Sequence, residues 1–259
     1  MGAAGVQRAA IVTGGASGIG RSTVELLVER GYGVVAVDLT TDNFGWVPEG
    51  APVMPMAGDV TDEGVNAAMV AACVERFGRL DVSVLNAGIP GSGPLETLDM
   101  AVLDRCYQLN VRAVALGIRA AIAPMRSVGG GSIVVTASTA GLGGEKGRWP
   151  YNTTKAAVLN LVRSASIDLA LDRIRVNAIC PGPVRSGMTD KHLGTDVGEG
   201  LRRMIPMQRW GDPDEVAAAI VFLASPEASF ITGVALPVDG GVSAGNGHSL
   251  PPQGEGVRG

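Results

Sequence analysis

Residues 9–38 have the sequence AAIVTGGASGIGRSTVELLVERGYGVVAVD, and this stretch decides the fold class. It begins with a short apolar run, Ala9–Val12, and passes through a glycine-rich turn into a segment with helical spacing of apolar residues, Ile19–Glu29. A second apolar run, Val34–Val37, follows and ends at Asp38. A strand, a helix and a strand in this order predict a βαβ unit, in which the two strands are parallel.

The turn between the first strand and the helix, Thr13–Gly20, contains four glycines. Such glycines allow a sharp bend and let backbone N–H groups approach a pyrophosphate, and the helix N-terminus adds a favourable dipole. Asp38 lies 18 residues after Gly20, where a carboxylate accepts hydrogen bonds from adenosine ribose hydroxyls and repels a 2′-phosphate. No basic residue occurs in Leu39–Thr41, so the pattern favours NAD over NADP. A P-loop is excluded because no Gly-Lys-Ser/Thr follows the glycines.

The rest of the chain repeats this alternation of short Val-, Ile- and Ala-rich runs with longer helical patterns. The predicted strands are Ala9–Val12, Val34–Val37, Val53–Met56, Val82–Leu85, Ser132–Thr136, Arg175–Ile179 and Val234–Pro237. The predicted helices are Ile19–Glu29, Asp62–Phe77, Asp99–Met125, Tyr151–Leu171 and Pro213–Ala224. No linker divides the chain. We therefore expect one α/β domain over residues 1–241, a doubly wound, mostly parallel seven-stranded sheet with helices on both faces and a Rossmann-like architecture.

Two segments depart from the alternating pattern. Thr189–Ile205 is long, polar and glycine-containing for a connection in such a domain, which predicts a mobile lid over the substrate. Residues 242–259 have few apolar side chains and are expected to form a C-terminal tail.

Composition and short motifs exclude several classes of protein. A net charge of −4 and a pI near 5.3 do not fit nucleic-acid binding, and no stretch approaches the roughly 20 apolar residues of a membrane span. The cysteines, Cys73, Cys106 and Cys180, form no Cys-x-x-Cys pair, and His192 and His248 lack nearby metal-ligand partners, so no disulfide framework or metal site is expected. The N-terminus lacks signal-peptide and myristoylation patterns, which predicts a cytoplasmic protein.

Four residues stand at positions suited to acid–base chemistry. Tyr151 and Lys155 are four residues apart and are therefore neighbours on one helix face. Ser138 follows a predicted strand, at the carboxyl edge where open α/β sheets bind ligands. Asn110 lies inside the long predicted helix Asp99–Met125.

With these four residues the chain resembles the classical short-chain dehydrogenase/reductase family, over roughly residues 8–241. The glycine spacing Thr13-Gly14-x-x-x-Gly18-x-Gly20 is similar to that of the family, as is the 13-residue separation of Ser138 and Tyr151. Two departures are mild. Leu85 stands where the family often has an additional Asn, and Ser186 stands where it usually has Thr, which keeps the hydroxyl.

The resemblance implies roles for individual residues. The catalytic residues implied are Asn110, Ser138, Tyr151 and Lys155. The cofactor-binding residues implied are Gly14, Ser17, Gly18, Ile19, Gly20, Asp38, Asp59, Val60, Asn86, Ala87, Gly88, Tyr151, Lys155, Pro181, Gly182, Val184 and Ser186. Among them, Asp59 and Val60 would contact the adenine, Asn86–Gly88 would support the cofactor and the central sheet, and the segment from Pro181 would hold the nicotinamide carboxamide. Asn110 would hold a water that links Lys155 to solvent.

The chemistry of hydride transfer explains these residue types. Removing a hydride from a carbinol carbon requires that the hydroxyl proton be taken at the same time, and the reverse reaction requires that it be supplied. A phenol with a pKa of about 10 is a poor base at neutral pH. The Lys155 ammonium and an oxidised nicotinamide would stabilise the Tyr151 phenolate and lower its pKa. Ser138 would orient the reacting oxygen.

We therefore expect an NAD-dependent oxidoreductase for a secondary alcohol or ketone. An NADP-linked 3-oxoacyl-carrier reductase of the same family, a catalytically idle dinucleotide-binding or scaffold protein, and a methyltransferase are the alternatives. Asp38 disfavours the first, and the Ser138, Tyr151 and Lys155 set disfavours the other two. Arg148 and Trp149, just before Tyr151, either line the substrate mouth or only pack the loop and expose a charge.

The end of the domain predicts self-association. The helix Pro213–Ala224 is apolar over much of its circumference, and the strand Val234–Pro237 would lie at the sheet edge, where an uncovered strand risks aggregation. We expect both to pack against their copies within a homotetramer, the arrangement that the family resemblance implies, with the tail against a neighbouring subunit.

Overall fold

A computed structural model describes residues 8–187 and 189–245. The predicted tail, residues 242–259, lies outside the described residues from residue 246 on, and His248 lies there with it. Within the described part of the tail, Val242–Ala244 form a short 3-10 turn.

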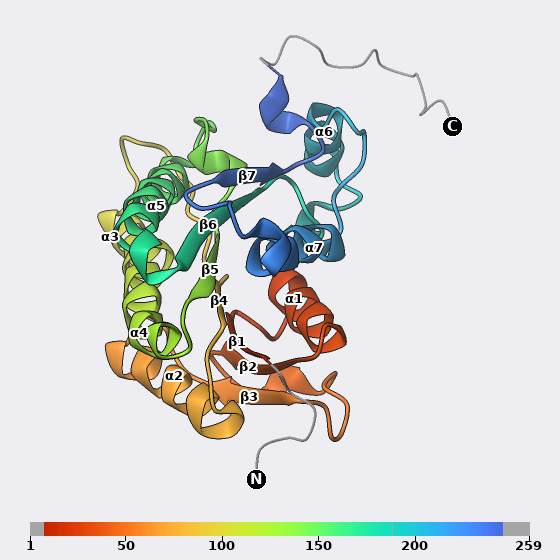
Figure 1. The fold of residues 1–259 in the computed structure, drawn as a ribbon. Helices are drawn as coiled ribbons and strands as arrows, with labels where there is room; N and C mark the ends of the chain where they lie inside the picture. Colours follow the sequence, from red (N-terminus) through yellow and green to blue (C-terminus); the bar gives the residue numbers. More distant parts are fainter. Residues whose placement is uncertain (1–7, 188, 246–259) are drawn as a thin grey trace.

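Seven strands form a single sheet (Figure 1). They are β1 (Arg8–Thr13), β2 (Tyr32–Asp38), β3 (Val53–Ala57), β4 (Val82–Leu85), β5 (Gly131–Thr136), β6 (Ile174–Pro181) and β7 (Ala235–Val238). The order across the sheet is β3-β2-β1-β4-β5-β6-β7, and every neighbouring pair is parallel. The predicted doubly wound sheet is confirmed. Because the order reverses between β1 and β4, the ligand crevice of such a fold lies at the carboxyl ends of these central strands.

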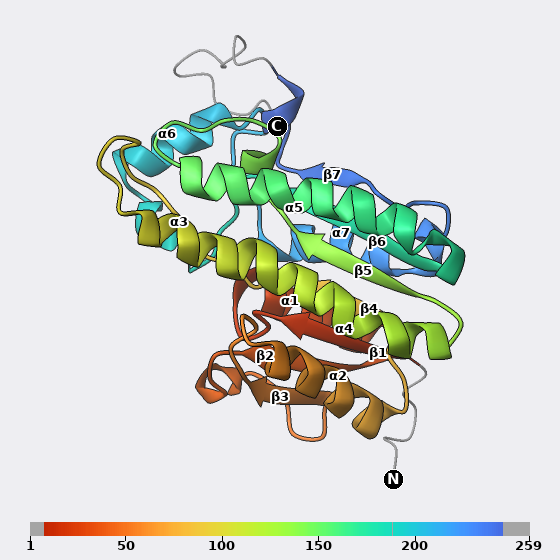
Figure 2. The ribbon, with the colours of Figure 1, turned by 90° about the vertical axis from the view of Figure 1, so that its left-hand side faces the viewer.

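Helices cover both faces of the sheet (Figures 1 and 2). One face carries α1 (Gly18–Glu29) and α7 (Pro213–Ala224), and the other carries α2 (Glu63–Phe77), α4 (Ala113–Ser127) and α5 (Trp149–Asp168). Successive side chains of a strand point to opposite faces. Ile11 therefore packs in the apolar cluster beneath α2, α4 and α5, whereas its neighbour Val12 packs in the cluster beneath α1 and α7.

The helix predicted over Asp99–Met125 is present and is unbroken from Met100 to Ser127, but its hydrogen bonding changes in the middle. It consists of α3 (Met100–Tyr107), a π-helical turn at Gln108–Arg112, and α4. Asn110 is in the middle of the π turn, and its side chain forms hydrogen bonds with the backbone of the loop after β4. A π turn adds a residue without interrupting the apolar spacing enough to be recognised from sequence, and such turns often occur at functional sites.

The segment Thr189–Ile205, predicted to be a mobile lid, contains a 3-10 turn at Asp190–His192 and the helix α6 (Asp196–Met204), which was not predicted from the sequence. The Thr195 hydroxyl caps α6 by accepting a hydrogen bond from Gly198 N at 3.1 Å. Glu199 pairs with two arginines of the same helix, Arg202 and Arg203. Local capping and short-range ion pairs thus give helical structure to a segment whose composition is polar.

The last helix begins as predicted, with Asp212 and Glu215 forming a capping box and Pro213 in the first turn. The helix α1 buries part of the apolar surface of α7, because the two helices pack side by side on the same face of the sheet. Phe222 nevertheless remains 43% exposed, and β7 lies at the edge of the sheet.

Two further findings concern the described residues. None of their helices is both long and apolar enough to span a membrane. Across residues 8–187 and 189–245, no group of three or more His, Cys, Asp or Glu side chains is arranged to hold a metal ion.

Candidate active site

The carboxyl ends of three central strands are joined by one side chain, Asn86, which follows β4. Its backbone N donates to the Thr13 hydroxyl at 2.9 Å, and its Nδ2 donates to the Thr13 carbonyl at 3.2 Å, so it binds the end of β1. Its Oδ1 accepts a hydrogen bond from the Thr136 hydroxyl, at the end of β5, at 3.0 Å. This geometry shows that Asn86 supports the central sheet, and the support of the cofactor predicted for it stays a prediction. The same geometry also shows that Thr13 and Thr136 belong to the site.

Tyr151 and Ser138 meet beside this network. Tyr151 lies in the first turn of α5, Ser138 lies just after β5, and both are buried. The Ser138 Oγ accepts a hydrogen bond from Ala140 N at 3.1 Å, which fixes its orientation at the start of a short 3-10 turn. Burial raises the pKa of the Tyr151 phenol, and a hydrogen bond with the Ser138 side chain partly opposes that effect.

Lys155 is one helical turn further along α5 and is almost completely buried. Its Nζ donates to the Thr136 carbonyl at 2.8 Å and lies 5.6 Å from the centroid of the Tyr151 ring. Burial lowers the pKa of Lys155 to about 8, because desolvation disfavours the charged ammonium. A Cβ on Gly88 would lie 3.4 Å from this Nζ, so glycine leaves room for the lysine at that position.

Asn110 lies close to the same group of side chains, but its own side chain is engaged in local structure. Nδ2 donates to the Ile89 carbonyl at 3.0 Å and to the Thr154 hydroxyl at 3.1 Å, and Oδ1 accepts from Ile89 N at 2.9 Å. Both amide hydrogens are therefore used, which leaves one lone pair of Oδ1 for a further partner. Asn110 fixes the loop after β4 against α5, and the water relay predicted for it stays a prediction.

The glycine-rich turn has the close backbone contacts that its sequence predicts. Gly14 and Gly18 have φ angles of +64° and +50°, which favour glycine. A Cβ on Gly20 would lie 1.9 Å from the Gly14 carbonyl oxygen, so no other residue fits at that position. The N-cap of α1 is Ser17, and its side chain makes no capping hydrogen bond. The Ser17 hydroxyl and the N–H groups of the first turn of α1 can therefore bind an anionic ligand.

Asp38 lies at the end of β2 against this turn. Its Oδ2 accepts a hydrogen bond from Ala16 N at 3.1 Å, and its Oδ1 accepts one from Leu39 N at 2.9 Å. Each oxygen keeps a lone pair for another donor. Trp46 closes the same region, since its Nε1 donates to the Ala16 carbonyl at 3.1 Å.

The segment after β6 faces the glycine turn. A Cβ on Gly18 would lie 3.4 Å from the Cβ of Ser186, although the two residues are far apart in sequence. Gly182 allows a close approach of Asp239, because a Cβ there would lie 2.8 Å from the Asp239 Cα. The structure thus brings the predicted positions of the Pro181–Ser186 segment to the same edge as the first turn of α1.

The pair predicted at the adenine end is arranged differently. Asp59 is exposed, and its Oδ1 accepts hydrogen bonds from Thr61 N at 2.9 Å and from the Thr61 hydroxyl at 2.8 Å. Val60 is buried in the core, and its carbonyl accepts from the Asn66 side chain at 2.8 Å. Both residues hold local structure, and their contact with a nucleotide stays a prediction.

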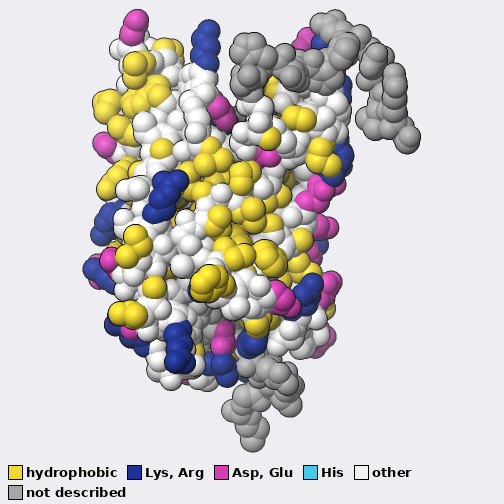
Figure 3. Space-filling view, turned by 45° about the horizontal axis from the view of Figure 1, so that its top comes forward, with side chains coloured by type: hydrophobic (Ala, Val, Ile, Leu, Met, Phe, Trp, Pro, Cys, Tyr) yellow, Lys and Arg dark blue, Asp and Glu magenta, His cyan; other side chains and the backbone are white. Residues whose placement is uncertain are grey.

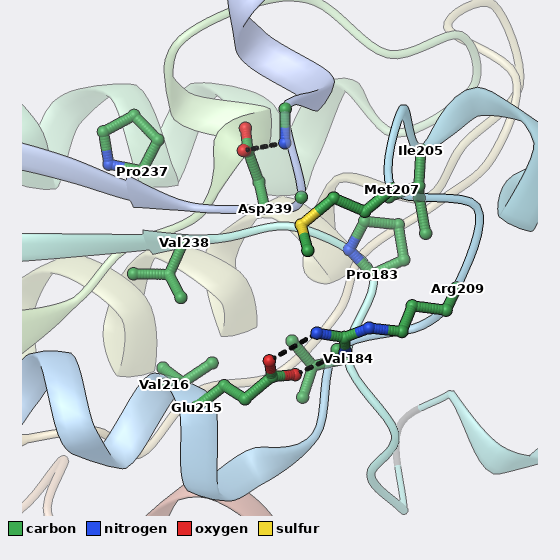
Figure 4. Close-up of a pocket in the computed structure, with 13 residues that line it drawn as sticks. Pro183, Val184, Ile205, Met207, Arg209, Glu215, Val216, Pro237, Val238 and Asp239 are labelled. Carbon is green, nitrogen blue, oxygen red and sulfur yellow. Dashed lines mark hydrogen bonds and ion pairs between the residues drawn. The ribbon is translucent and has the colours of Figure 1, made fainter. Parts of the chain in front are cut away.

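A hollow of about 490 Å³ lies next to the Pro181–Ser186 segment (Figure 4). Its wall includes Pro183 and Val184, the apolar side chains of Ile205 and Met207, and the Arg209–Glu215 ion pair. None of the four predicted catalytic residues lines it. The hollow lies between the end of β7 and the start of α7 (Figure 4).

Sequence reasoning missed three threonines of this site, Thr13, Thr136 and Thr154. Each holds a predicted site residue: Thr13 and Thr136 bind Asn86, Thr136 also accepts from Lys155 through its carbonyl, and Thr154 binds Asn110. A hydroxyl at the end of an otherwise apolar buried strand, as at Thr13 and Thr136, was the available signal.

Comparison with known proteins gives one consistent result. The family model described as enoyl-(acyl carrier protein) reductase matches residues 14–243. The cis-4-hydroxycyclohexanecarboxylate dehydrogenase of Sinomonas cyclohexanicum is 41% identical, with 94% of this chain and 100% of that protein covered. The 2-(R)-hydroxypropyl-CoM dehydrogenase of Xanthobacter autotrophicus is 38% identical, with 92% and 100% covered.

Two further similarities cover nearly the whole chain. The 3-oxoacyl-[acyl-carrier-protein] reductase of Thermotoga maritima is 35% identical, with 90% of this chain and 96% of that protein covered. The crystal structure of levodione reductase has a TM-score of 0.87 and 32% sequence identity, with 92% of this chain and 98% of that chain covered.

Proposed function

Because this chain belongs to the short-chain dehydrogenase/reductase family, we propose that it transfers a hydride between NAD(H) and a secondary alcohol or ketone, with Tyr151 as the general acid/base. The observation that carries the proposal is the buried cluster of Ser138, Tyr151 and Lys155 at the carboxyl ends of the central strands. The glycine turn and Asp38 lie at the same edge of the sheet.

The cluster divides the acid–base work among its members. When bound, the nicotinamide supplies the hydride acceptor or donor. In alcohol oxidation Tyr151 removes the hydroxyl proton of the substrate, and in ketone reduction it returns that proton. Ser138 hydrogen-bonds the reacting oxygen. The Lys155 ammonium, present below its pKa of about 8, stabilises the phenolate form of Tyr151 and opposes the effect of burial on that phenol.

We infer NAD as the cofactor from Asp38. Its carboxylate is fixed against the glycine turn and has free lone pairs for ribose hydroxyls, while its charge repels a 2′-phosphate. Arg21, which stacks on Trp46 near this turn, is paired with Glu25. Its charge is therefore partly neutralised within the chain and is less suited to hold a phosphate.

A 3-oxoacyl-carrier reductase that uses NADP is the second candidate, and the name of the Thermotoga relative favours its substrate, though it does not specify the cofactor. The other two relatives have names that specify a hydroxycyclohexanecarboxylate and a 2-hydroxypropyl-CoM conjugate as substrates. A scaffold protein without catalysis would not need the buried Lys155 beside Tyr151.

A substrate panel separates these candidates. The purified protein is incubated with NAD⁺ or NADP⁺ and with cyclohexanols, 2-hydroxypropyl thioethers or 3-hydroxyacyl thioesters, and the absorbance of the reduced cofactor is followed. Turnover of a secondary alcohol with NAD⁺ supports the proposal. Turnover of only the acyl thioester with NADP⁺ identifies the second candidate, and no turnover of any substrate by a protein that binds NADH supports a non-catalytic role.

We also propose a homotetramer with α7 and β7 at one interface. β7 is an edge strand, and Phe222 of α7 and Phe230 of the following loop are 43% and 104% exposed. Figure 3 shows apolar side chains gathered across the middle of the face that carries these elements. Light scattering at micromolar concentration tests this assembly, and a stable, active monomer contradicts it.

A further inference from the structure

The turn that precedes Tyr151 carries two opposite charges that the proposed mechanism does not use. Glu145 and Arg148 form an ion pair, and the side chain of each is a little over one third exposed. The Arg148 Cζ lies 4.7 Å from the centroid of the Tyr151 ring, nearer than the Lys155 Nζ at 5.6 Å. A guanidinium over an aromatic face is attracted by the negative charge of that face, and a phenolate ring attracts it more strongly than a phenol.

The turn is held in place by several hydrogen bonds. Arg148 N donates to the Glu145 carbonyl at 3.3 Å, and the Asn152 side chain, in the first turn of α5, donates to the same carbonyl at 2.9 Å. Gly93 N, from the loop after β4, donates to the Gly147 carbonyl at 2.8 Å. Arg148 is also the N-cap residue of α5. Its backbone is therefore fixed relative to the Tyr151 ring, and Glu145 restrains its side chain.

The titratable and charged groups around Tyr151 come from several segments. Arg148 and Glu145 belong to the turn, Lys155 to α5 and Cys106 to α3. Burial is the largest influence and raises the pKa of Tyr151, and the hydrogen bond with Ser138 lowers it. The positive charge of Arg148 lowers this pKa as well, whereas Glu145 and Cys106 raise it.

We propose that Arg148 is a positioning residue for Tyr151. Glu145 holds the Arg148 guanidinium over the Tyr151 ring, and the guanidinium favours the phenolate form of this general base. Glu145 has two opposite effects: it holds the cation in place and it limits the strength of the cation's field. The inference rests on the role proposed above for Tyr151. It requires that the pH at which Tyr151 ionises shift when either charge is removed, upward without the Arg148 charge and downward without the Glu145 charge.

The first test is the pH dependence of kcat/KM for alcohol oxidation. Arg148→Gln leaves Glu145 unopposed, so the midpoint of the rise in rate moves up by about one pH unit, the size expected for a partly exposed charge near the ring. Glu145→Gln keeps a side-chain oxygen that can accept from Arg148, so it retains the restraint and removes only the negative charge, and the midpoint moves down by a smaller amount. Arg148→Lys keeps the charge and restores most of the wild-type profile. The matched control is Lys146→Gln, which removes an exposed cation of the same turn and leaves the midpoint unchanged.

The second test measures the phenolate directly and does not require activity. The chain has three tyrosines, so the difference in ultraviolet absorbance between each protein and its Tyr151→Phe counterpart during a pH titration reports Tyr151 alone. The proposal predicts that the midpoint of this absorbance titration moves up in Arg148→Gln and down in Glu145→Gln, as the midpoints of the rate profiles do. Because the signal is not a rate, it stays informative even if the oxidoreductase activity proposed above is absent.

Three outcomes overturn the inference. In the first, Arg148→Gln lowers the rate, but the midpoint of the pH–rate profile and the midpoint of the absorbance titration both keep the wild-type value, which shows a purely structural role. In the second, Lys146→Gln shifts the midpoints as much as Arg148→Gln, which shows a general effect of net charge. In the third, the midpoints stay in place while only KM for carboxylate-bearing alcohols rises, which shows that Arg148 binds the substrate.

Discussion

The two halves of the sheet contribute to the candidate site in different ways. The half formed by β1, β2 and β3 contributes mainly backbone, a glycine turn and the first turn of α1, and one side chain, the Asp38 carboxylate, which accepts from two backbone N–H groups. The half formed by β5, β6 and β7 contributes side chains from separate segments, with Ser138 after β5 and Tyr151 and Lys155 on α5. Backbone geometry depends on a short local sequence, whereas a side-chain cluster depends on distant segments meeting. The first half should therefore tolerate most substitutions of exposed side chains, and the second should not.

The largest effect is expected for Tyr151→Phe in the side-chain half. The variant should lose at least a thousandfold in kcat/KM, about 4 kcal/mol of transition-state stabilisation, because the proton acceptor is removed. NADH affinity should stay within a few-fold of wild type, since the glycine turn and Asp38 are unchanged. Steady-state kinetics and fluorescence titration with NADH measure the two quantities. An activity within about tenfold of wild type contradicts the role of Tyr151.

A second effect concerns stability and the buried Lys155. Its pKa is lowered from 10.5 to about 8, so below pH 8 the folded protein holds a desolvated charge at a cost. Between pH 8 and 10.5 the unfolded chain binds more protons at Lys155 than the folded chain does. The contribution of Lys155 to the free energy of unfolding therefore rises with pH in this range. Lys155→Met should remove this rise, which is about 3 kcal/mol at most. Urea unfolding of both proteins at pH 7, 9 and 10.5 measures it, and parallel stability curves for the two proteins contradict the prediction.

A smaller effect is expected at Asp38, in the backbone half. Wild-type catalytic efficiency should be well over tenfold higher with NAD than with NADP. Asp38→Ala should narrow this ratio by about tenfold, about 1.4 kcal/mol, because it removes the charge that repels a 2′-phosphate. Kinetics with both cofactors measure the ratio, with Asp42→Ala, an exposed carboxylate nearby in sequence, as the control. A wild-type preference for NADP shows that Asp38 does not select the cofactor.

The smallest effect is expected in the lid segment. Thr195→Ala removes the cap of α6 and should cost about 1 kcal/mol of local stability, with little change in the global unfolding free energy. Hydrogen exchange should become faster in residues 196–204 and stay unchanged in α5. Thr195→Ser, which keeps the hydroxyl, is the matched control. Equal exchange in the alanine variant and the wild type contradicts the importance of this cap.

The difference between the two halves of the sheet also explains which features could be predicted from the sequence. The strands and the glycine turn follow from local patterns, and the predicted ends of all seven strands lie within two residues of the observed ends. The resemblance to a family indicated Ser138, Tyr151 and Lys155, and the structure places these side chains close together, while their catalytic roles stay predictions. The π turn at Asn110 escaped prediction because it changes backbone bonding without changing the apolar pattern.

Two other features needed the folded chain. α6 escaped prediction because its stability comes from a cap and ion pairs within a polar segment. The partners of Lys155 and Asn86 at Thr136 depend on a register between strands that no local pattern specifies. The opposed charges around Tyr151 likewise become visible only when the turn is placed over the ring.

The hydrogen bonds of Asn86 have a consequence for the order of events during folding. One side chain joins Thr13 to Thr136, so the site closes only after strands far apart in the chain have found their neighbours. Contacts of such long sequence separation form slowly, because loop-closure entropy opposes them until the intervening segments are ordered. Helices such as α2 form from local interactions and are ordered earlier. During refolding, the ability to bind cofactor should therefore return later than the helical circular dichroism signal, and the active site serves as a reporter of completed assembly.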